Sequence, residues 1–288
     1  MEKIHSIQDM KMQASQARAA GKTIGFVPTM GCLHEGHLSL VRHSQTTCDY
    51  TVVSIFINPA QFGENEDLDN YPVELGKDRR KLETLGVDAL FLPSRMTIYP
   101  EGYKTFVTVE DITARLCGKS RPLLFDGVTT IIIKLFNIVT PHRAFFGEKD
   151  RQQLQVIETM VRDLNLDVLI VGLPIIREPD GLAMSSRNLY LSAKQRSSAL
   201  SLNRALKTAE NLIQNGETSA EKIKETMREI INKEEHTEID FISVCDKETF
   251  MDKELVTDDV LIALAVQIGD ARLIDNCLVE GNGCKGLC

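Results

Sequence analysis

The chain has no long apolar run, no excess of positive charge and no closely paired cysteines. Apolar stretches such as Thr51–Ile57 and Val168–Leu173 have the length of strands and are far shorter than the ~18 residues that a membrane helix needs. The first residues, Met1-Glu2-Lys3-Ile4-His5, are charged and lack the apolar core of a signal peptide. We therefore predict a cytoplasmic protein without a membrane partner.

Positive charge is in the minority, with 33 Lys and Arg residues against 41 Asp and Glu residues and a formal net charge of −8. Such a chain is a poor candidate for wrapping nucleic acid. The cysteines are odd in number, scattered and without any C-x-x-C pair, so we expect reduced thiols. The seven are Cys32, Cys48, Cys117, Cys245, Cys277, Cys284 and Cys288.

The first part of the chain alternates strand and helix patterns, and its 288 residues are enough for two domains. Strands separated by helices of this length imply βαβ units and an open parallel sheet, which is an α/β fold. The predicted strands are Thr23–Val27, Tyr50–Ile57, Asp88–Leu92, Ala144–Phe146 and Asp167–Val171. The predicted helices are Gly36–Thr47, Leu75–Leu85, Arg121–Val139 and Asp150–Leu164.

The pattern changes after Leu191. Two helices are followed by three strand patterns with no long helix between them, which predicts a small α+β domain with a largely antiparallel sheet. The helices are 193–215 and 219–232, and the strands are 239–244, 260–266 and 272–279. We place the boundary near Ile176, just before a predicted turn at Pro179-Asp180-Gly181, with one domain over residues 1–176 and a second over 177–288.

Three of the six histidines, His34, His37 and His43, follow the first predicted strand within the segment 28–43. We expect the strand to end at Pro28 and a helix to begin near Glu35. Backbone N–H groups at a helix start attract anions, and two residues three apart share one face of the first turn. The pattern predicts a nucleoside triphosphate over this turn, with imidazoles donating hydrogen bonds to it.

Two other interpretations of this segment remain open on the residues alone. Cys32, His34 and His37 could ligate a metal, although the histidines are one residue short of the H-E-x-x-H spacing and a further ligand and second shell are unspecified. Alternatively, the histidines could simply cap the helix or face solvent.

Two later clusters favour the phosphate interpretation. Lys149 lies in Gly147-Glu148-Lys149-Asp150, between a predicted strand and a helix, where an ammonium group can bind phosphate. The polar loop Asp180–Asn188 carries two hydroxyls and an arginine, which suit phosphates as they separate. Taken singly, Lys149 could be a surface lysine and the Ser-Ser pair of the loop an ordinary helix cap.

Together these clusters resemble the pantoate–β-alanine ligase family of the nucleotidyltransferase superfamily, which has an HxGH signature and a second phosphate-gripping loop. The resemblance covers almost the whole chain in the same order. It rests on Pro28–Leu40, Val53–Phe62, Lys134–Val139, Phe146–Leu154 and Arg177–Asn188.

The resemblance implies a Rossmann-like domain that binds ATP and pantoate and a smaller C-terminal lid domain. It implies that the carboxylate of (R)-pantoate attacks the α-phosphorus of ATP, giving pantoyl adenylate and pyrophosphate. The amine of β-alanine then attacks the acyl carbon and releases pantothenate, a precursor of coenzyme A, and AMP. It also implies a requirement for Mg²⁺ and a homodimer.

The resemblance also implies the site residues. His37, His34 and Lys149 are the catalytic candidates, with His37 favoured for donating a proton to the developing charge. The ATP-binding candidates are Met30, Gly31, Cys32, Leu33, His34, Glu35, Gly36, His37, Gly147, Glu148, Lys149, Asp150, Ile176, Met184, Ser185, Ser186 and Arg187. The candidates for pantoate and β-alanine are Gln61, Gln153, Asn58, Phe62 and Met30, and Asp78 is the candidate for the metal.

The amides of Asn58, Gln61 and Gln153 can hydrogen-bond a hydroxylated acid without repelling it, and Phe62 and Met30 can form an apolar wall. The chain departs from the family at Leu123-Leu124, where Gly-His is usual, and at Val73, where Arg is common. Two alternatives therefore stay open: a nucleotidyltransferase that keeps the nucleotide on its product, and a nucleotide-binding regulator without turnover.

Overall fold

The computed structural model describes residues 1–64 and 66–280, so Cys284 and Cys288 lie outside the described residues. The chain divides into two compact units. The first consists of residues 1–110, 121–148 and 153–175, and the second of 111–120, 149–152 and the chain from Ile176 onward. The boundary predicted between residues 176 and 177 stays a prediction.

The first unit is built on a six-stranded sheet in which every neighbouring pair is parallel. The strand order is β1-β4-β3-β2-β5-β6, so the parallel α/β sheet expected from the sequence is confirmed. The strands are β1 (Glu2–Ile4), β2 (Ile24–Thr29), β3 (Tyr50–Ile55), β4 (Ala89–Phe91), β5 (Arg143–Gly147) and β6 (Leu169–Leu173).

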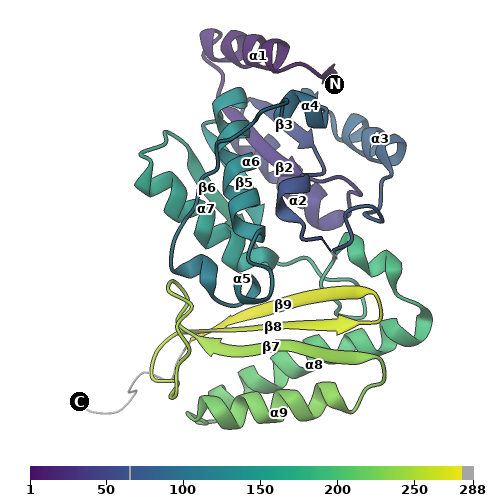
Figure 1. Ribbon diagram of the computed structural model, residues 1–288, viewed down its shortest axis with the longest axis vertical. Coiled ribbons are helices and arrows are strands. Elements are labelled where there is room, and N and C mark those ends of the chain that lie inside the picture. Colours follow the sequence, from purple (N-terminus) through teal and green to yellow (C-terminus); the bar gives the residue numbers. More distant parts are fainter. Residues whose placement is uncertain (65, 281–288) are drawn as a thin grey trace. The chain divides into compact units, whose positions relative to one another are not determined.

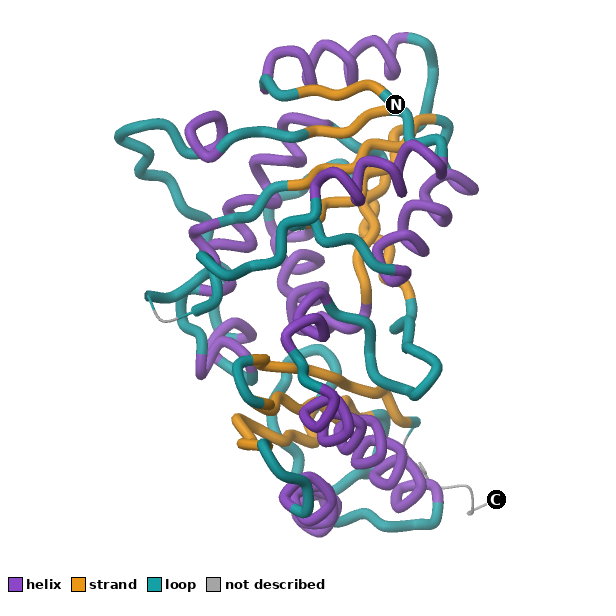
Figure 2. Tube along the Cα trace, turned by 90° about the vertical axis from the view of Figure 1, so that its right-hand side faces the viewer, coloured by secondary structure: helices purple, strands orange, loops and turns teal. Residues whose placement is uncertain are grey.

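Helices cover both faces of this sheet (Figure 2). Successive strand residues point to opposite faces, so Phe26 and Val52 pack in one hydrophobic cluster while Val27 and Val53 pack in the other. One face is covered by α1 (Ile7–Ala19), α4 (Arg95–Ile98), α6 (Leu124–Val139) and α7 (Arg151–Asp163), and the other by α2 (Glu35–Thr47) and α3 (Leu75–Leu85).

The sequence predicted that the strand ends at Pro28, and this is wrong. Pro28 lies inside β2 and pairs with Ser54 of β3. Successive residues of β2 direct their backbone hydrogen bonds alternately to the β5 side and to the β3 side. The Ile24 carbonyl accepts the N–H of His142, which precedes β5, and the Thr29 carbonyl accepts the N–H of Phe56, which follows β3. Pro28 therefore faces the β5 side, where pairing with β5 ends at Phe26. Its missing N–H leaves no ladder bond unmade.

The second unit contains an antiparallel sheet of β7 (Thr237–Cys245), β8 (Val260–Ile268) and β9 (Ala271–Val279). The long helices α8 (Ala193–Gln214) and α9 (Ala220–Asn232) pack on one face of it (Figure 1). Ile112 and Leu116 pack on the other face, and α5 (Cys117–Ser120) follows them. This is the α+β arrangement that the sequence predicts. No helix in the described part of the chain is long and apolar enough to span a membrane.

The parallel sheet reverses its order at one point, between β2 and β5. The chain runs from β2 through α2 to β3 on one side, and from β5 through α7 to β6 on the other. The connections therefore leave the carboxyl ends of two adjacent strands in opposite directions. In open α/β sheets this is where ligands bind.

The turn that follows β2 is held by α3. Gly31 and Cys32 have positive φ angles of 87° and 50°, a conformation that is strained for a residue with a side chain. Asp78 of α3 compensates: its two carboxylate oxygens accept the backbone N–H groups of Cys32 at 2.7 Å and Leu33 at 2.8 Å. Lys81, one turn further along α3, donates to the Leu33 carbonyl. The entry to α2 is thus bonded to α3 through both its donors and its acceptor.

Replacing Asp78 by Asn is expected to destabilise the first unit by about 1–3 kcal/mol, because the amide can accept only one of the two buried N–H groups and turns a donor toward the other. The measurement is the free energy of unfolding from urea titration, with the exposed Glu83→Gln substitution on α3 as the control. Equal stability of the two variants would contradict this role for Asp78.

Candidate active site

The residues predicted to bind phosphate in the first unit gather at the start of α2. His34 immediately precedes the helix and His37 lies in its first turn. Their rings stack at 4.1 Å between centroids, and the His34 backbone N–H donates to His37 Nδ1 at 3.4 Å. Because Nδ1 accepts this bond, the neutral His37 ring carries its proton on Nε2 and can donate it to a ligand.

Cys32 lies in the turn before these histidines and is buried. Burial, together with the nearby Asp78 carboxylate, raises the pKa of its thiol, so the sulfur stays protonated near neutral pH and is a poor metal ligand. The residues that the structure describes contain no group of three or more His, Cys, Asp or Glu side chains that could hold a metal ion. The interpretation of Cys32, His34 and His37 as a metal site thus finds no support.

Asp78, the candidate for the metal, has surroundings that give it another task. It is 1% exposed, and both of its oxygens accept main-chain N–H groups from the turn. This carboxylate does not fit a magnesium site, because such a site needs oxygens that are turned to the ion and its water ligands. The metal assignment of Asp78 stays a prediction.

Three of the residues predicted to bind the acid, Asn58, Gln61 and Phe62, lie in or next to a short 3-10 turn after β3, Pro59–Gln61. Asn58 caps this turn and is 1% exposed. Its Nδ2 donates to Gln61 Oε1 at 3.0 Å, and Gln61 Nε2 lies 3.1 Å from the sulfur of Met30. The fold therefore joins Met30, at the end of β2, to two of the predicted amides.

The remaining candidates of this unit are placed less directly. Phe62 is buried and packs edge-on against Tyr71 at 6.1 Å between ring centroids. Gln153 lies in the first turn of α7 and is half-buried. Arg121, next to the unusual Leu123-Leu124, pairs with Glu66 and donates to the Gln61 carbonyl at 3.2 Å.

In the second unit, β9 holds the segment that carries Lys149. The side chain of Asn276 donates to the Lys149 carbonyl at 2.9 Å. The preceding residue, Asp275, is 2% exposed and accepts two hydrogen bonds from the guanidinium of Arg177, at 2.7 and 3.0 Å. Arg177 begins the loop that carries the predicted Ser-Ser-Arg group. Two consecutive residues of one strand thus fix both predicted phosphate-binding segments of this unit.

The loop after Arg177 folds back on itself. The Gly181 N–H bonds the Glu178 carbonyl at 2.8 Å, and the Met184 N–H bonds the Ile176 carbonyl at 3.0 Å, which confirms the predicted turn at Gly181. Ser185 then caps the 3-10 helix Ser186–Tyr190 by accepting from the Arg187 N–H.

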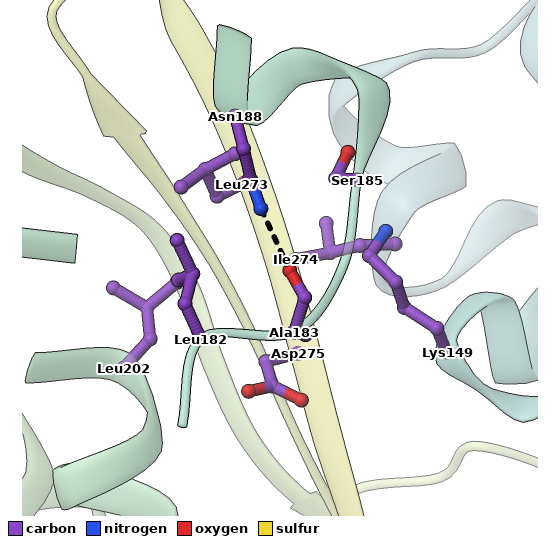
Figure 3. Close-up of a pocket in the computed structure, with 9 residues that line it drawn as sticks. All are labelled: Lys149, Leu182, Ala183, Ser185, Asn188, Leu202, Leu273, Ile274 and Asp275. Carbon is purple, nitrogen blue, oxygen red and sulfur yellow. Dashed lines mark hydrogen bonds between the residues drawn. The ribbon is translucent and has the colours of Figure 1, made fainter. Parts of the chain in front are cut away.

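A small pocket opens beside this loop (Figure 3). Lys149 and Ser185 contribute its polar rim, and Asn188 crosses it to donate to the Ala183 carbonyl at 3.1 Å. The other residues around it are Leu182, Leu202, Leu273, Ile274 and Asp275. The lining thus brings together an ammonium group, a hydroxyl and the Asp275 carboxylate, which is itself paired with Arg177.

The sequence did not identify several residues that hold these groups. Tyr99 bonds Asn58, Lys81 bonds the turn before His34, and Asp275 and Asn276 hold the segments of the second unit. Only the last pair left a signal, since two polar residues in the middle of the apolar pattern 272–279 are unusual for a buried strand.

Comparison with known proteins points to one family. The family model for pantoate-beta-alanine ligase matches residues 2–278. Pantothenate synthetase of Caldicellulosiruptor bescii is 56% identical over 277 residues, which cover 96% of this chain and 98% of the relative. That of Acetivibrio thermocellus is 54% identical over 280 residues, covering 97% and 100%.

Solved structures agree. Pantothenate synthetase from Thermus thermophilus superposes with a TM-score of 0.90 at 40% identity, covering 96% of this chain and 99% of that one. Pantoate-beta-alanine ligase from Francisella tularensis, complexed with beta-gamma ATP and beta-alanine, gives a TM-score of 0.80 at 33% identity, covering 96% and 97%. The chain therefore belongs to the pantoate–β-alanine ligase family.

Proposed function

We propose that this protein catalyses the ATP-dependent condensation of (R)-pantoate with β-alanine to pantothenate, releasing AMP and pyrophosphate. Membership of the family supports the reaction, and the Francisella tularensis relative was solved with beta-gamma ATP and β-alanine. The observation in the chain itself that carries the proposal is the position of His34 and His37. They follow the carboxyl end of β2, at the point where the sheet order reverses, and stand at the start of a helix.

In the first step, a carboxylate oxygen of pantoate attacks the α-phosphorus of ATP. A new P–O bond forms, the bond to the β-phosphate oxygen breaks, and pyrophosphate leaves. Such a displacement needs positioning and charge stabilisation more than a covalent nucleophile. His37 donates Nε2–H to the oxygens on which charge develops, and His34 binds the phosphates. Lys149 and the Ser185-Ser186-Arg187 group stabilise the departing pyrophosphate.

In the second step, the amine of β-alanine attacks the acyl carbon of pantoyl adenylate. The C–N bond forms, the bond between the acyl carbon and the phosphate oxygen breaks, AMP leaves, and the amine nitrogen gives up one proton to solvent. Gln61 and Gln153 orient pantoate by hydrogen bonds, while Met30 and Phe62 contact its gem-dimethyl group. The half-buried Met30 beside Gln61 supports this placement, because it puts an apolar and a polar group side by side.

Mg²⁺ forms part of the proposal as the ion that accompanies ATP and neutralises phosphate charge. Phosphate oxygens and water supply most of its coordination in sites of this kind. Asp78→Asn tests whether Asp78 binds the ion or only holds the turn before α2. Added Mg²⁺ restores activity if Asp78 binds the ion, and does not restore it if Asp78 holds the turn.

We further propose that the protein acts in the cytoplasm as a homodimer. The family resemblance supports the homodimer. The measurement for the homodimer is the molar mass in solution by sedimentation, for which the dimer is twice the 32.2 kDa of one chain.

Replacing His37 by Ala is expected to lower kcat by about 10²–10³-fold, the usual effect of removing one donor to a developing oxyanion. The fold should persist, because the His37 side chain accepts a long main-chain hydrogen bond from His34 rather than packing in a core. The measurement is the steady-state rate of AMP formation, with circular dichroism to check folding and the exposed His5→Ala as the control. Near-normal turnover of His37→Ala would remove the HxGH turn from the mechanism.

The order of the chemistry predicts an isotope exchange. Enzyme, Mg²⁺, ATP and pantoate, without β-alanine, should transfer labelled pyrophosphate into ATP, because a non-covalent pantoyl adenylate forms reversibly. Omitting pantoate should abolish the exchange. AMP should accumulate stoichiometrically with pantothenate only when both substrates are present.

Other outcomes of these assays would indicate a different reaction or no reaction. Exchange without pantoate indicates a nucleotidylated enzyme, and pyrophosphate release without AMP indicates a nucleotidyltransferase that keeps the nucleotide on its product. ATP binding without any turnover indicates a regulator. Normal pantothenate synthesis without exchange would exclude free pyrophosphate release before the amine binds.

A further inference from the structure

We propose that Asn58 and Tyr99 are positioning residues, which fix the Gln61 side-chain amide with its NH₂ group, and not its carbonyl oxygen, toward the bound acid. The inference rests on the proposed function, because Gln61 is placed there as a contact of pantoate. It assigns a task to Tyr99 and changes that of Asn58 from contact with the substrate to support of Gln61.

The Asn58 side chain has no hydrogen-bonding capacity left for a substrate. Nδ2 donates to the Gly127 carbonyl and to Gln61 Oε1, both at 3.0 Å. Oδ1 accepts the Tyr99 hydroxyl at 2.8 Å and the Ala60 N–H at 3.4 Å. An amide side chain offers two N–H donors and two lone pairs, and all four are used inside the chain. The residue is 1% exposed.

The direction of this amide follows from its main-chain partners. A backbone carbonyl can only accept and a backbone N–H can only donate, so Gly127 fixes the side of Nδ2 and Ala60 fixes the side of Oδ1. The group that Gln61 turns to Asn58 Nδ2 must then be an acceptor, which is its carbonyl oxygen. The NH₂ group of Gln61 consequently points the other way, toward Met30.

The partner on the NH₂ side of Gln61 is a weak one. Its Nε2 lies 3.1 Å from the Met30 sulfur, and a thioether is a poor acceptor compared with a carboxylate or hydroxyl oxygen. An acid that brings such an oxygen to Nε2 therefore gains a stronger hydrogen bond there. A group that can only donate, such as an ammonium, meets a donor and is disfavoured.

Tyr99 holds Asn58 in turn, because its hydroxyl donates to Asn58 Oδ1. Its ring lies 6.2 Å from that of Phe56 and 5.0 Å from that of Tyr103, and the Lys134 ammonium lies 4.1 Å from the Tyr103 ring centroid. Burial, with a contribution from Tyr103, raises the pKa of Tyr99 far above its ordinary value. The hydroxyl therefore remains a donor to Asn58 at any pH at which the protein is assayed.

The main chain beneath Gln61 is equally fixed. A Cβ atom at Gly127 of α6 would come within 2.4 Å of Ala60 and 2.5 Å of the Gln61 nitrogen. Only glycine allows this approach, and it brings the Gly127 carbonyl to Asn58. Because the backbone is held this closely, the orientation of the Gln61 side-chain amide is set by the hydrogen bonds of Asn58 and Tyr99.

The first test compares Tyr99→Phe with Tyr103→Phe, which removes a neighbouring hydroxyl outside the chain of hydrogen bonds. Tyr99→Phe is expected to raise the KM for pantoate about 3- to 10-fold, the effect of weakening one hydrogen bond, and to leave the KM for ATP unchanged. Tyr103→Phe should change neither. In a Gln61→Ala background, the effect of Tyr99→Phe on pantoate should vanish. Equal effects of the two Phe substitutions, or an undiminished effect in that background, would overturn the proposal.

The second test reverses the polarity of Gln61. Gln61→Glu keeps an oxygen toward Asn58 but puts a second oxygen where the NH₂ group was. It should raise the KM for pantoate by roughly a further 10-fold beyond Gln61→Ala, because two acceptors then face each other. A smaller effect than that of Gln61→Ala would show that Gln61 presents its carbonyl and would overturn the proposal.

These outcomes are distinguishable from failure of the proposed function. If Gln61→Ala leaves the KM for pantoate unchanged, pantoate does not contact Gln61 and the positioning proposal is overturned. The overall reaction would still be tested separately, by the pantoate-dependent exchange of pyrophosphate into ATP.

Discussion

The two hydrogen bonds that the Asp78 carboxylate accepts from the turn before α2 are the interaction on which the first unit's site depends. A glycine and a cysteine in left-handed conformation let the chain reverse after β2, and only a fixed acceptor can hold the two buried N–H groups that result. Without that carboxylate, both N–H groups would be buried without an acceptor at the entry to α2. The two histidine rings and the hydrogen bond between their residues follow from it.

The same principle recurs in the other parts of the chain that carry predicted site residues. Polar side chains with little or no exposure, Asn58, Asp275 and Asn276, direct their hydrogen bonds to neighbouring segments. Burial strengthens such bonds and makes an unpaired group costly. The residues proposed to touch substrate can therefore stay partly exposed and polar, because buried polar groups hold the side chains or the backbone of their segments.

Five strands of the parallel sheet, the small antiparallel sheet and most helix bounds were predictable from the sequence, because they depend on local periodicity, whereas β1 was not predicted. Helix α6 formed although Thr129–Ile133 is β-branched, because burial between the sheet and its neighbours outweighs propensity. Helix α1 was overlooked, yet Ser6 and Asp9 form the cap that would have revealed it. The supports Asp78 and Tyr99 lie 41 to 46 residues from their partners, and no local pattern encodes such a distance.

Because Asp275 and Asn276 are adjacent on β9, the contacts of both residues depend on the length of the connection between β8 and β9. Successive side chains of a strand point to opposite faces, so each of the two residues reaches a different segment. Deleting or inserting one residue in the connection at Gly269 would shift β9 by one position against β8 and exchange these directions. Arg177 would lose its carboxylate and Lys149 its amide in a single event. Among natural variants of this chain, length changes at that hairpin should therefore be rarer than substitutions there.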